Sequence, residues 1–405
     1  MAVGLDIGTT SIKAALGEIT YGQEVNILGV CQASSTGLRR GNIIDIENTA
    51  NSIAECLHEL QRLTGVEVYN AVVGFSSADI LSINNRAVIA VGNPGSEILP
   101  EDKERVLKSA QNIPLPPDKI VVQKVEKQYI VDGYEGVKDP IGMIGSRLEA
   151  EVSVIVAKTA AVQNLYRSAE RINLRIDRCI YNQLLAAETV LLPAEKEIGV
   201  LLIDIGGGTT KISFFEKGSF VHTVVLPVGG EYITRDLAII LKTSFDEALR
   251  IKEQYGVASP FFVEEGITVK IKNIQGNGTR EVSVRTIAEI IQARILEIME
   301  LIQAQMESLG LMCKIPGGIV IVGGEALLPG MVEVIEECLG FPVRIGIPEN
   351  VRGISGDFSV PQNASAVGAV AWAAKNMLLA HDGNNYARFN RLFDKLGYFV
   401  KDLFS

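Results

Sequence analysis

Two short segments of the chain carry carboxylates, glycines and hydroxyls in the same order. Residues 1–13 read MAVGLDIGTTSIK, and residues 199–215 read GVLLIDIGGGTTKISFF. Glycine permits close backbone approach and unusual dihedral angles, so N–H groups in such loops can converge on an anion. One such turn alone is compatible with a hairpin that only serves the fold. A purely structural turn would not be expected to recur with the same preceding Asp-Ile-Gly sequence. We therefore predict two phosphate-binding loops, formed by Gly8, Thr9, Thr10 and Lys13 and by Gly206, Gly207, Gly208, Thr209 and Thr210.

Two aspartates, Asp6 and Asp204, stand just before these loops. Magnesium prefers one or two carboxylates together with water and phosphate oxygens. Two aspartates that face each other across a cleft would meet that preference. We therefore predict that both hold Mg²⁺, through water.

A third glycine-bearing segment, GGIVIVGGEALLPG at residues 317–330, has a buried type of strand, a Gly-Gly turn and the start of a helix. Such a turn lets a flat base lie against the backbone. Alone, it is compatible with any loop between a strand and a helix. After the two phosphate loops it completes an ATP site, and its candidate residues are Gly323, Gly324, Glu325 and Ala326.

The whole chain bounds the classes of function that need consideration. Its 405 residues are more than a single hydrophobic core usually accommodates, so two or more lobes are expected. A net charge of -10 argues against nucleic acid as a partner. Five scattered cysteines without a CxxC pair favour reduced thiols, and three isolated histidines give no zinc pattern. With no signal-peptide pattern and no long apolar run, we expect a soluble, cytoplasmic body.

The elements that must position these loops follow from the repeat. Each loop joins two apolar runs, which predicts β-hairpins near the starts of two similar lobes that face each other across a cleft. A small α/β insertion is expected in the first lobe, because a Pro-rich break at 113–117 precedes strand-like runs around Val121 and Val152. A helix-rich insertion is expected in the second, with helices at 243–252 and from Thr286, as the N-cap, to about Leu309.

The last residues carry an amphipathic pattern after a short break at 382–385. Apolar side chains recur at helical spacing on one face, and basic residues outnumber acidic ones on the other. A terminal helix packed on its own core would show a similar stripe. The linker, the aromatic residues and the basic face instead favour a helix in an anionic membrane interface. Its candidate residues are Phe389, Arg391, Leu392, Phe393, Lys395, Leu396, Phe399, Val400, Lys401, Leu403 and Phe404.

The three motifs in this order resemble those of the actin, sugar-kinase and heat-shock-chaperone superfamily. Within it, the chain resembles the FtsA family, whose signatures are similar to DPIGMIGSRLEA at 139–150 and LPVGGEYITRDL at 226–237. The resemblance implies an α/β, actin-like, two-lobed fold with duplicated mixed-sheet subdomains around a nucleotide cleft. It also implies ATP with Mg²⁺, self-association into filaments, binding of the FtsZ tail near residues 230–300, and contact with other division proteins. The expected location is the cytoplasmic face of the membrane at the division site.

On this resemblance the chain divides into six parts. The first lobe takes 1–81 and 161–195, with a return of the chain near 365–380, and its insertion takes 82–160. The second lobe takes 196–229 and 301–364, and its insertion takes 230–300. A linker at 381–387 leads to the membrane-targeting helix at 388–405.

Three segments depart from patterns common in related proteins. Leu249 stands where a glutamate often precedes the retained Lys252, which we count among the ATP-binding residues. Glu325 replaces a common glycine, and residues 182–183 (Asn-Gln) replace a Glu-Pro pair that positions the attacking water in chaperone-like relatives. We assign no catalytic residue and expect ATP binding with weak or no hydrolysis.

Two other readings stay open from the residues. A sugar or acid kinase of the same superfamily would need a catalytic aspartate placed for a substrate hydroxyl, and no such motif is visible. A pilus-assembly actin homologue shares the phosphate loops but usually docks to a membrane protein's peptide. The tail favours the FtsA reading over both.

Overall fold

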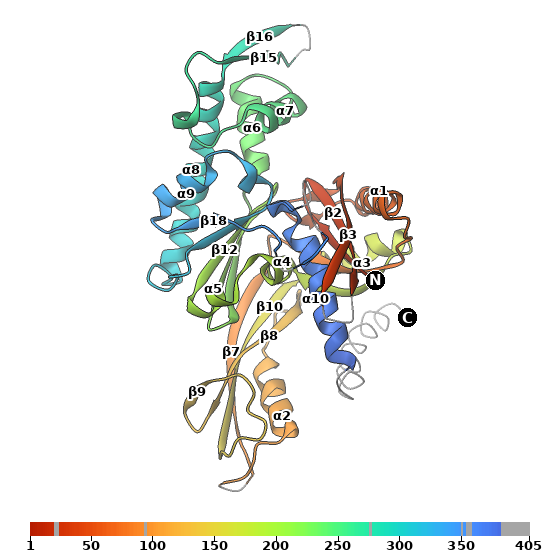
Figure 1. The fold of residues 1–405 in the computed structure, drawn as a ribbon, viewed down its shortest axis with the longest axis vertical. Coiled ribbons are helices and arrows are strands. Elements are labelled where there is room, and N and C mark those ends of the chain that lie inside the picture. The colour runs from red at the N-terminus through yellow and green to blue at the C-terminus, as the bar shows by residue number, and fades with distance from the viewer. Residues whose placement is uncertain (20–23, 93–94, 275–277, 350, 354–358, 382–405) are drawn as a thin grey trace.

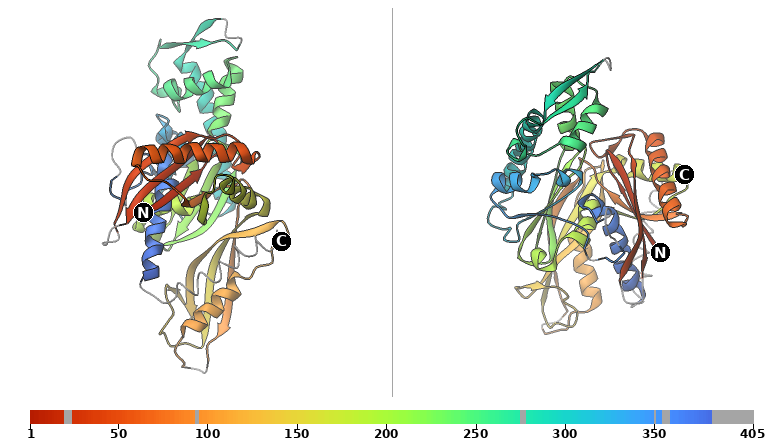
Figure 2. Two further views of the ribbon diagram at one scale, coloured as in Figure 1. Left: turned by 90° about the vertical axis from the view of Figure 1, so that its right-hand side faces the viewer. Right: turned by 45° about the horizontal axis from the view of Figure 1, so that its top comes forward.

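The computed structural model describes residues 1–19, 24–92, 95–274, 278–349, 351–353 and 359–381. The predicted helix at 388–405 and most of its predicted linker lie outside the described residues. Two five-stranded sheets form the centre of the molecule, and each carries an insertion. The two insertions lie at opposite ends of the long axis (Figure 1; Figure 2, left).

The first sheet has the strand order β11-β6-β1-β2-β3. Its strands are β1 (Ala2–Ile7), β2 (Ser11–Ile19), β3 (Val25–Ser34), β6 (Asn70–Phe75) and β11 (Arg175–Tyr181). Around it lie α1 (Ile46–Thr64), α3 (Thr159–Arg171), α4 (Asn182–Val190) and α10 (Ala364–His381), which η4 (Pro361–Asn363) precedes, together with a short hairpin of β4 (Leu38–Arg39) and β5 (Asn42–Ile43). The short helix α5 (Pro193–Ile198) instead contacts β13 (Thr210–Glu216) of the second sheet.

The second sheet repeats the first in order and direction. Its order is β14-β13-β12-β17-β18, with β12 antiparallel to β13 and parallel to β17, as β1 is to β2 and β6. Its strands are β12 (Val200–Ile205), β13 (Thr210–Glu216), β14 (Ser219–Leu226), β17 (Ile319–Val322) and β18 (Val343–Ile345). Between β17 and β18 the chain forms η2 (Gly324–Leu327) and α9 (Met331–Leu339). The prediction of two duplicated mixed sheets is confirmed.

The insertion of the first lobe is a four-stranded antiparallel sheet with one helix. Its elements are β7 (Leu81–Ala90), α2 (Pro100–Gln111), β8 (Lys119–Val131), β9 (Tyr134–Val137) and β10 (Arg147–Lys158). It packs against the edge strand β14 of the other lobe, where the Ser82 hydroxyl accepts from the Thr223 N–H (3.0 Å) and the Ser153 hydroxyl donates to the Val221 carbonyl (3.1 Å). The insertion therefore contacts both lobes.

The insertion of the second lobe is mostly helical. Its elements are α6 (Gly230–Ile240), α7 (Phe245–Tyr255), η1 (Pro260–Phe262), β15 (Thr268–Lys272), β16 (Thr279–Ser283) and α8 (Val284–Ser308). The predicted N-cap at Thr286 is wrong, because α8 begins at Val284 and the Ser283 hydroxyl accepts from the Arg285 N–H. The β15–β16 hairpin was not predicted, since its strands are mostly polar and exposed.

Close packing of α4 and α10 joins the lobes. Apolar residues of α4, such as Ala187 and Val190, belong to one buried cluster with Val200 and Val320 of the second sheet. A Cβ at Gly368 in α10 would overlap the Leu185 carbonyl of α4, so glycine lets the two helices approach. Since α10 also contacts β1 and α4 contacts β12, the packed helices connect the two sheets.

Candidate functional site

The tips of the two predicted hairpins meet in the centre of the molecule. Backbone bonds close both turns, from the Gly8 N–H to the Ser11 carbonyl (3.1 Å) and from the Gly206 N–H to the Thr209 carbonyl (3.0 Å). A Cβ at Gly207 would overlap the Thr10 side chain, and one at Gly208 would lie 2.6 Å from Thr9 Oγ1. Glycine is therefore required where the second loop touches the first, and the structure brings the predicted phosphate loops together.

The threonines of the two loops differ in their surroundings. Thr10 is exposed, and Thr9 Oγ1 accepts from the Gly41 N–H at 3.0 Å. Thr209 and Thr210 are buried, and the Thr210 hydroxyl donates to the Val228 carbonyl at 2.9 Å. The hydroxyl of Thr210 thus serves the fold of its own lobe.

Each predicted metal-binding aspartate stands opposite a lysine on the neighbouring strand. Asp6 is in register with Lys13 on β2, and Asp204 is in register with Lys211 on β13. Both aspartates are buried. Lys13 was among the predicted site residues and Lys211 was not, although the equal spacing within the repeat was a signal for Lys211.

The two Asp–Lys pairs make different contacts. Lys211 Nζ lies 2.7 Å from Asp204 Oδ2, and both side chains are about 90% buried, with exposed fractions of 8% and 10%. Lys13 Nζ instead donates to Ser11 Oγ (2.9 Å), and Asp6 Oδ1 accepts from Asn182 Nδ2 (2.7 Å). Among the described residues, Asp204 has a cationic partner in contact and Asp6 has none.

Burial raises the pKa of Asp6 above its ordinary value, while the positive charges of Lys13 and Lys211 act in the opposite direction. The ionised carboxylate is therefore costly without a cation beside it. Within the described part of the chain, Asn182 Oδ1 and both amide atoms of Gln183 are also buried without a hydrogen-bond partner. Carboxylates next to unpaired amide groups fit a hydrated divalent cation, which needs oxygen acceptors for itself and its waters.

The third predicted segment reaches the second loop. β17 ends at Val322, and Gly323 follows with a φ of 92°, a conformation that favours glycine. A Cβ there would lie 2.5 Å from Asp204 Oδ1. A Cβ at Gly324 would meet nothing within 4 Å, so the backbone there borders open space. Ala326 is buried beneath it.

Glu325 pairs with the predicted Lys252. Lys252 Nζ on α7 lies 2.6 Å from Glu325 Oε1, and the side chains are 11% and 9% exposed. A Cβ at Gly230 would overlap the Glu325 carboxylate, so glycine at the start of α6 makes room for it. In related proteins a glutamate at the position of Leu249 often stands near this lysine. Here Glu325 of the third segment supplies the carboxylate next to Lys252 instead. Leu249 and Glu325 are both departures from the pattern of related proteins, and the structure connects them through Lys252.

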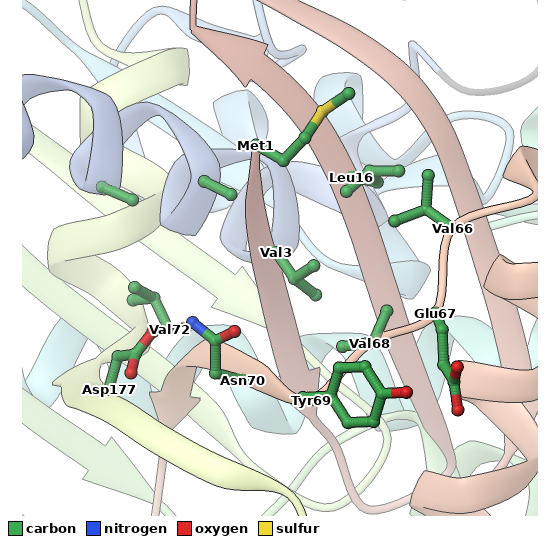
Figure 3. Close-up of a pocket in the computed structure, with 12 residues that line it drawn as sticks. Met1, Val3, Leu16, Val66, Glu67, Val68, Tyr69, Asn70, Val72 and Asp177 are labelled. Carbon is green, nitrogen blue, oxygen red and sulfur yellow. Dashed lines mark hydrogen bonds between the residues drawn. The ribbon is translucent and has the colours of Figure 1, made fainter.

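A separate pocket lies at the opposite end of β1 (Figure 3). It is lined by Met1, Val3, Leu16, Tyr69 and Asp177 among others, and its volume is about 110 Å³. That volume is well below the several hundred Å³ typical of small-molecule sites. None of the predicted site residues lines it, so we take the meeting point of the hairpins as the candidate site.

The described residues hold neither a membrane-spanning helix nor a cluster of metal ligands. They contain no helix long and apolar enough to span a bilayer. They also contain no group of three or more His, Cys, Asp or Glu side chains placed to hold a metal ion. The candidate metal site therefore rests on two carboxylates and their neighbours.

Comparison with family models gives two matches. Residues 201–368 match the model described as "Cell division protein FtsA", and residues 77–156 match the model described as "SHS2 domain inserted in FTSA". The second match covers the first-lobe insertion.

Curated relatives cover almost the whole chain. The cell division protein FtsA of Pseudomonas aeruginosa is 36% identical, over 96% of this chain and 93% of that protein. The FtsA of Borreliella burgdorferi is 34% identical, over 100% and 99%. That of Bacillus subtilis is 36% identical, over 92% and 83%.

Solved structures show the same fold at low identity. The chain is similar to one in the PilM-PilN type IV pilus biogenesis complex (TM-score 0.66, 16% identity, 92% of this chain and 98% of that one). It is also similar to MreB5 of Spiroplasma citri (TM-score 0.56, 14% identity, 94% and 98%). These likenesses establish an actin-like fold, and the family models and relatives establish more: the chain belongs to the FtsA family of cell division proteins.

Proposed function

We propose that the chain binds ATP with Mg²⁺ between its two hairpins and attaches division filaments to the cytoplasmic face of the membrane. The observation that carries the nucleotide part is the contact between the two glycine loops, directly beside two buried aspartates. The solved MreB5 structures of the same fold are described as bound to ADP and to AMPPNP, which supports the same use of the cleft here.

In this proposal different residues bind different parts of the nucleotide. Backbone N–H groups of both loops and the Lys13 ammonium hold the phosphates, and Asp6 and Asp204 hold the water shell of the metal. The open backbone at Gly324 takes the base, beside the Lys252–Glu325 pair. The metal, when bound, neutralises phosphate charge.

Hydrolysis is proposed to be weak or absent. The amides of Asn182 and Gln183 can orient a water molecule, but an amide cannot accept a proton from it as a general base does. Asp6, the carboxylate nearest to Asn182, is committed to the metal in this proposal. ATP would then act mainly as a binding partner that closes the cleft.

The membrane part rests on the sequence of residues 388–405. Partial burial of the aromatic and aliphatic side chains contributes less than the roughly 1.5–3 kcal/mol of a fully buried one. Each basic residue near an anionic leaflet contributes about 1 kcal/mol. One tail therefore binds reversibly, and a filament of this chain binds more tightly because it presents many tails.

The division partner is proposed to be the C-terminal tail of FtsZ, bound to residues 230–300. This region exposes large apolar side chains, with Ile239 73%, Ile274 68% and Phe261 85% exposed. Exposed large apolar side chains within this stretch of the chain support a docking role for it. We keep the domain boundaries of the sequence analysis as part of the proposal, together with contacts to other division proteins.

Liposome co-sedimentation tests the membrane part. The full chain, a chain ending at Ala380, and a full-length Leu392→Glu variant would each be mixed with anionic or neutral vesicles, with and without ATP. Only the unaltered full chain should pellet, and only with anionic vesicles. ATP should increase the fraction of protein in the pellet. Equal pelleting of the full and shortened chains would contradict the proposed anchor.

A further inference from the structure

The short β4–β5 hairpin places an arginine at an unfavourable backbone position. Its turn consists of Arg40 and Gly41, with φ of 50° and 74°. A two-residue turn with two positive φ values prefers Asn-Gly or Gly-Gly. A left-handed conformation costs a residue such as arginine roughly 1–2 kcal/mol. The Arg40 side chain must therefore contribute something that the turn itself does not need.

The base and one side of this hairpin are fixed to the first lobe. The Asn42 amide oxygen accepts from the Ser77 hydroxyl at 2.8 Å, and the Ile44 N–H donates to the Gly37 carbonyl at 2.8 Å. The Gly41 N–H donates to Thr9 Oγ1 of the first phosphate loop. Any displacement of that loop therefore moves the hairpin tip that carries Arg40.

The Arg40 side chain crosses to the second lobe. Its guanidinium donates to the Tyr232 hydroxyl and lies 5.7 Å from the centre of that ring. Tyr232 is held in place from its own side, because the guanidinium groups of Arg235 and Arg294 lie 5.8 and 5.6 Å from the ring centre. Arg294 is itself fixed by two hydrogen bonds to Asp236, at 2.6 and 3.0 Å.

The start of α6, which carries Tyr232, is tied to the second phosphate loop. The Gly230 and Glu231 N–H groups donate to the Gly206 and Gly207 carbonyls, at 2.9 and 2.8 Å. Arg40 and Tyr232 are thus each next in sequence to a residue that bonds to one of the two loops. Their contact joins the two lobes close to the point where the loops meet.

We propose that Arg40 and Tyr232 form a cross-cleft latch that holds the two phosphate loops closed over a bound nucleoside triphosphate. The inference rests on the proposed function for the nature of the ligand. The latch touches no ligand, so both are positioning residues. It slows release of the nucleotide, because opening the cleft must first separate the guanidinium from the tyrosine.

The first measurement is the dissociation rate of a fluorescent ATP analogue from the full chain with Mg²⁺. Arg40→Asn suits the turn, so it removes the latch without harming the hairpin, and Tyr232→Phe removes only the hydroxyl. Each should speed dissociation about three- to tenfold, the effect of losing one net hydrogen bond. Because both remove the same contact, the double variant should be no faster than the faster single variant. Arg39→Asn, which removes the same charge one residue earlier, should match the parent chain.

Hydrogen exchange on the nucleotide-free chain is the second measurement. Tyr232→Phe should exchange faster at residues 38–43 and Arg40→Asn should exchange faster at the first turn of α6, while Arg39→Asn should change neither. If the parent chain binds no nucleotide, the proposed function fails, and this readout still tests the latch. Parent-like dissociation and exchange in both variants, or additive effects in the double variant, would overturn the latch.

Discussion

The two phosphate-loop hairpins share one backbone design and use their charges in opposite ways. In both, a buried aspartate on the first strand faces a lysine on the second. In the second hairpin the two side chains form a closed ion pair. In the first, Lys13 and Asp6 each bond to a neutral group instead.

This difference indicates a division of labour after duplication. A buried ion pair compensates its own charges, so Lys211 and Asp204 mainly hold the second hairpin together. In the first hairpin the ammonium stays available for a phosphate and the carboxylate for a cation. On the proposed function, the pair in the first lobe mainly serves ligand binding and the pair in the second lobe mainly serves structure, with Asp204 contributing less than Asp6 to the water shell of the metal.

The largest expected effect is on stability. Lys211→Met would leave Asp204 buried without its partner, and we expect a loss of about 3–5 kcal/mol in the free energy of unfolding. Lys13→Met should cost less than about 1 kcal/mol, because Lys13 bonds only to a serine. Urea denaturation of both variants measures the difference. Equal losses would show that the two hairpins do not differ as described.

Nucleotide affinity should reverse that order. Lys13→Met should weaken binding of Mg-ATP by about 10- to 100-fold, because it removes a hydrogen bond between charged groups. Lys211→Met, assayed at a temperature where it is folded, should weaken binding by less than about threefold. Isothermal titration calorimetry measures both, and an equal loss in the two variants would contradict the assignment.

The dependence of binding on magnesium should separate the aspartates. Asp6→Asn keeps the acceptor for Asn182 but loses the charge, so Mg²⁺ should strengthen nucleotide binding about tenfold less than in the parent chain. Asp204→Asn should have the smaller effect, since its carboxylate is already paired with Lys211. The same calorimetry, repeated at several Mg²⁺ concentrations, tests this ranking.

The smallest expected effect is a pH dependence of stability in the metal-free chain. Burial raises the pKa of Asp6 in the folded chain above its unfolded-state value of 3.8. The protonated carboxyl therefore stabilises the folded state below pH 3.8, and this stabilisation is lost as pH rises through the folded-state pKa. At pH 7, Asp6→Asn should therefore be more stable than the parent chain by about 1–2 kcal/mol. The difference should shrink towards pH 4 and on addition of Mg²⁺ with nucleotide. A variant less stable than the parent chain at pH 7 would contradict it.

Local patterns in the sequence predicted much of the fold. The repeated Asp-Ile-Gly lead located both hairpins, and the sheets around them have matching strand orders. The error at the start of α8 has a local cause. Ser283 and Thr286 can both cap a helix, and the sequence does not show that strand β16 ends directly at Ser283.

Side-chain contacts between elements far apart in the chain could not be predicted from the sequence. Glu325 and Lys252 meet only after α7 and the third segment pack together, and Arg40 meets Tyr232 only across the cleft. Asn182 was read as a substitution relative to other proteins, whereas its amide donates to Asp6. Such pairs depend on how elements far apart in the sequence pack together, which residue spacing does not encode.

A crystal structure of the full chain with AMPPNP and Mn²⁺ tests the central claim most directly, because anomalous scattering locates the manganese. We expect the triphosphate between the two glycine loops, Lys13 Nζ against a phosphate oxygen, and one manganese nearer to Asp6 than to Asp204. A manganese held by Asp204 with its lysine displaced, or a nucleotide bound away from the loops, would contradict it.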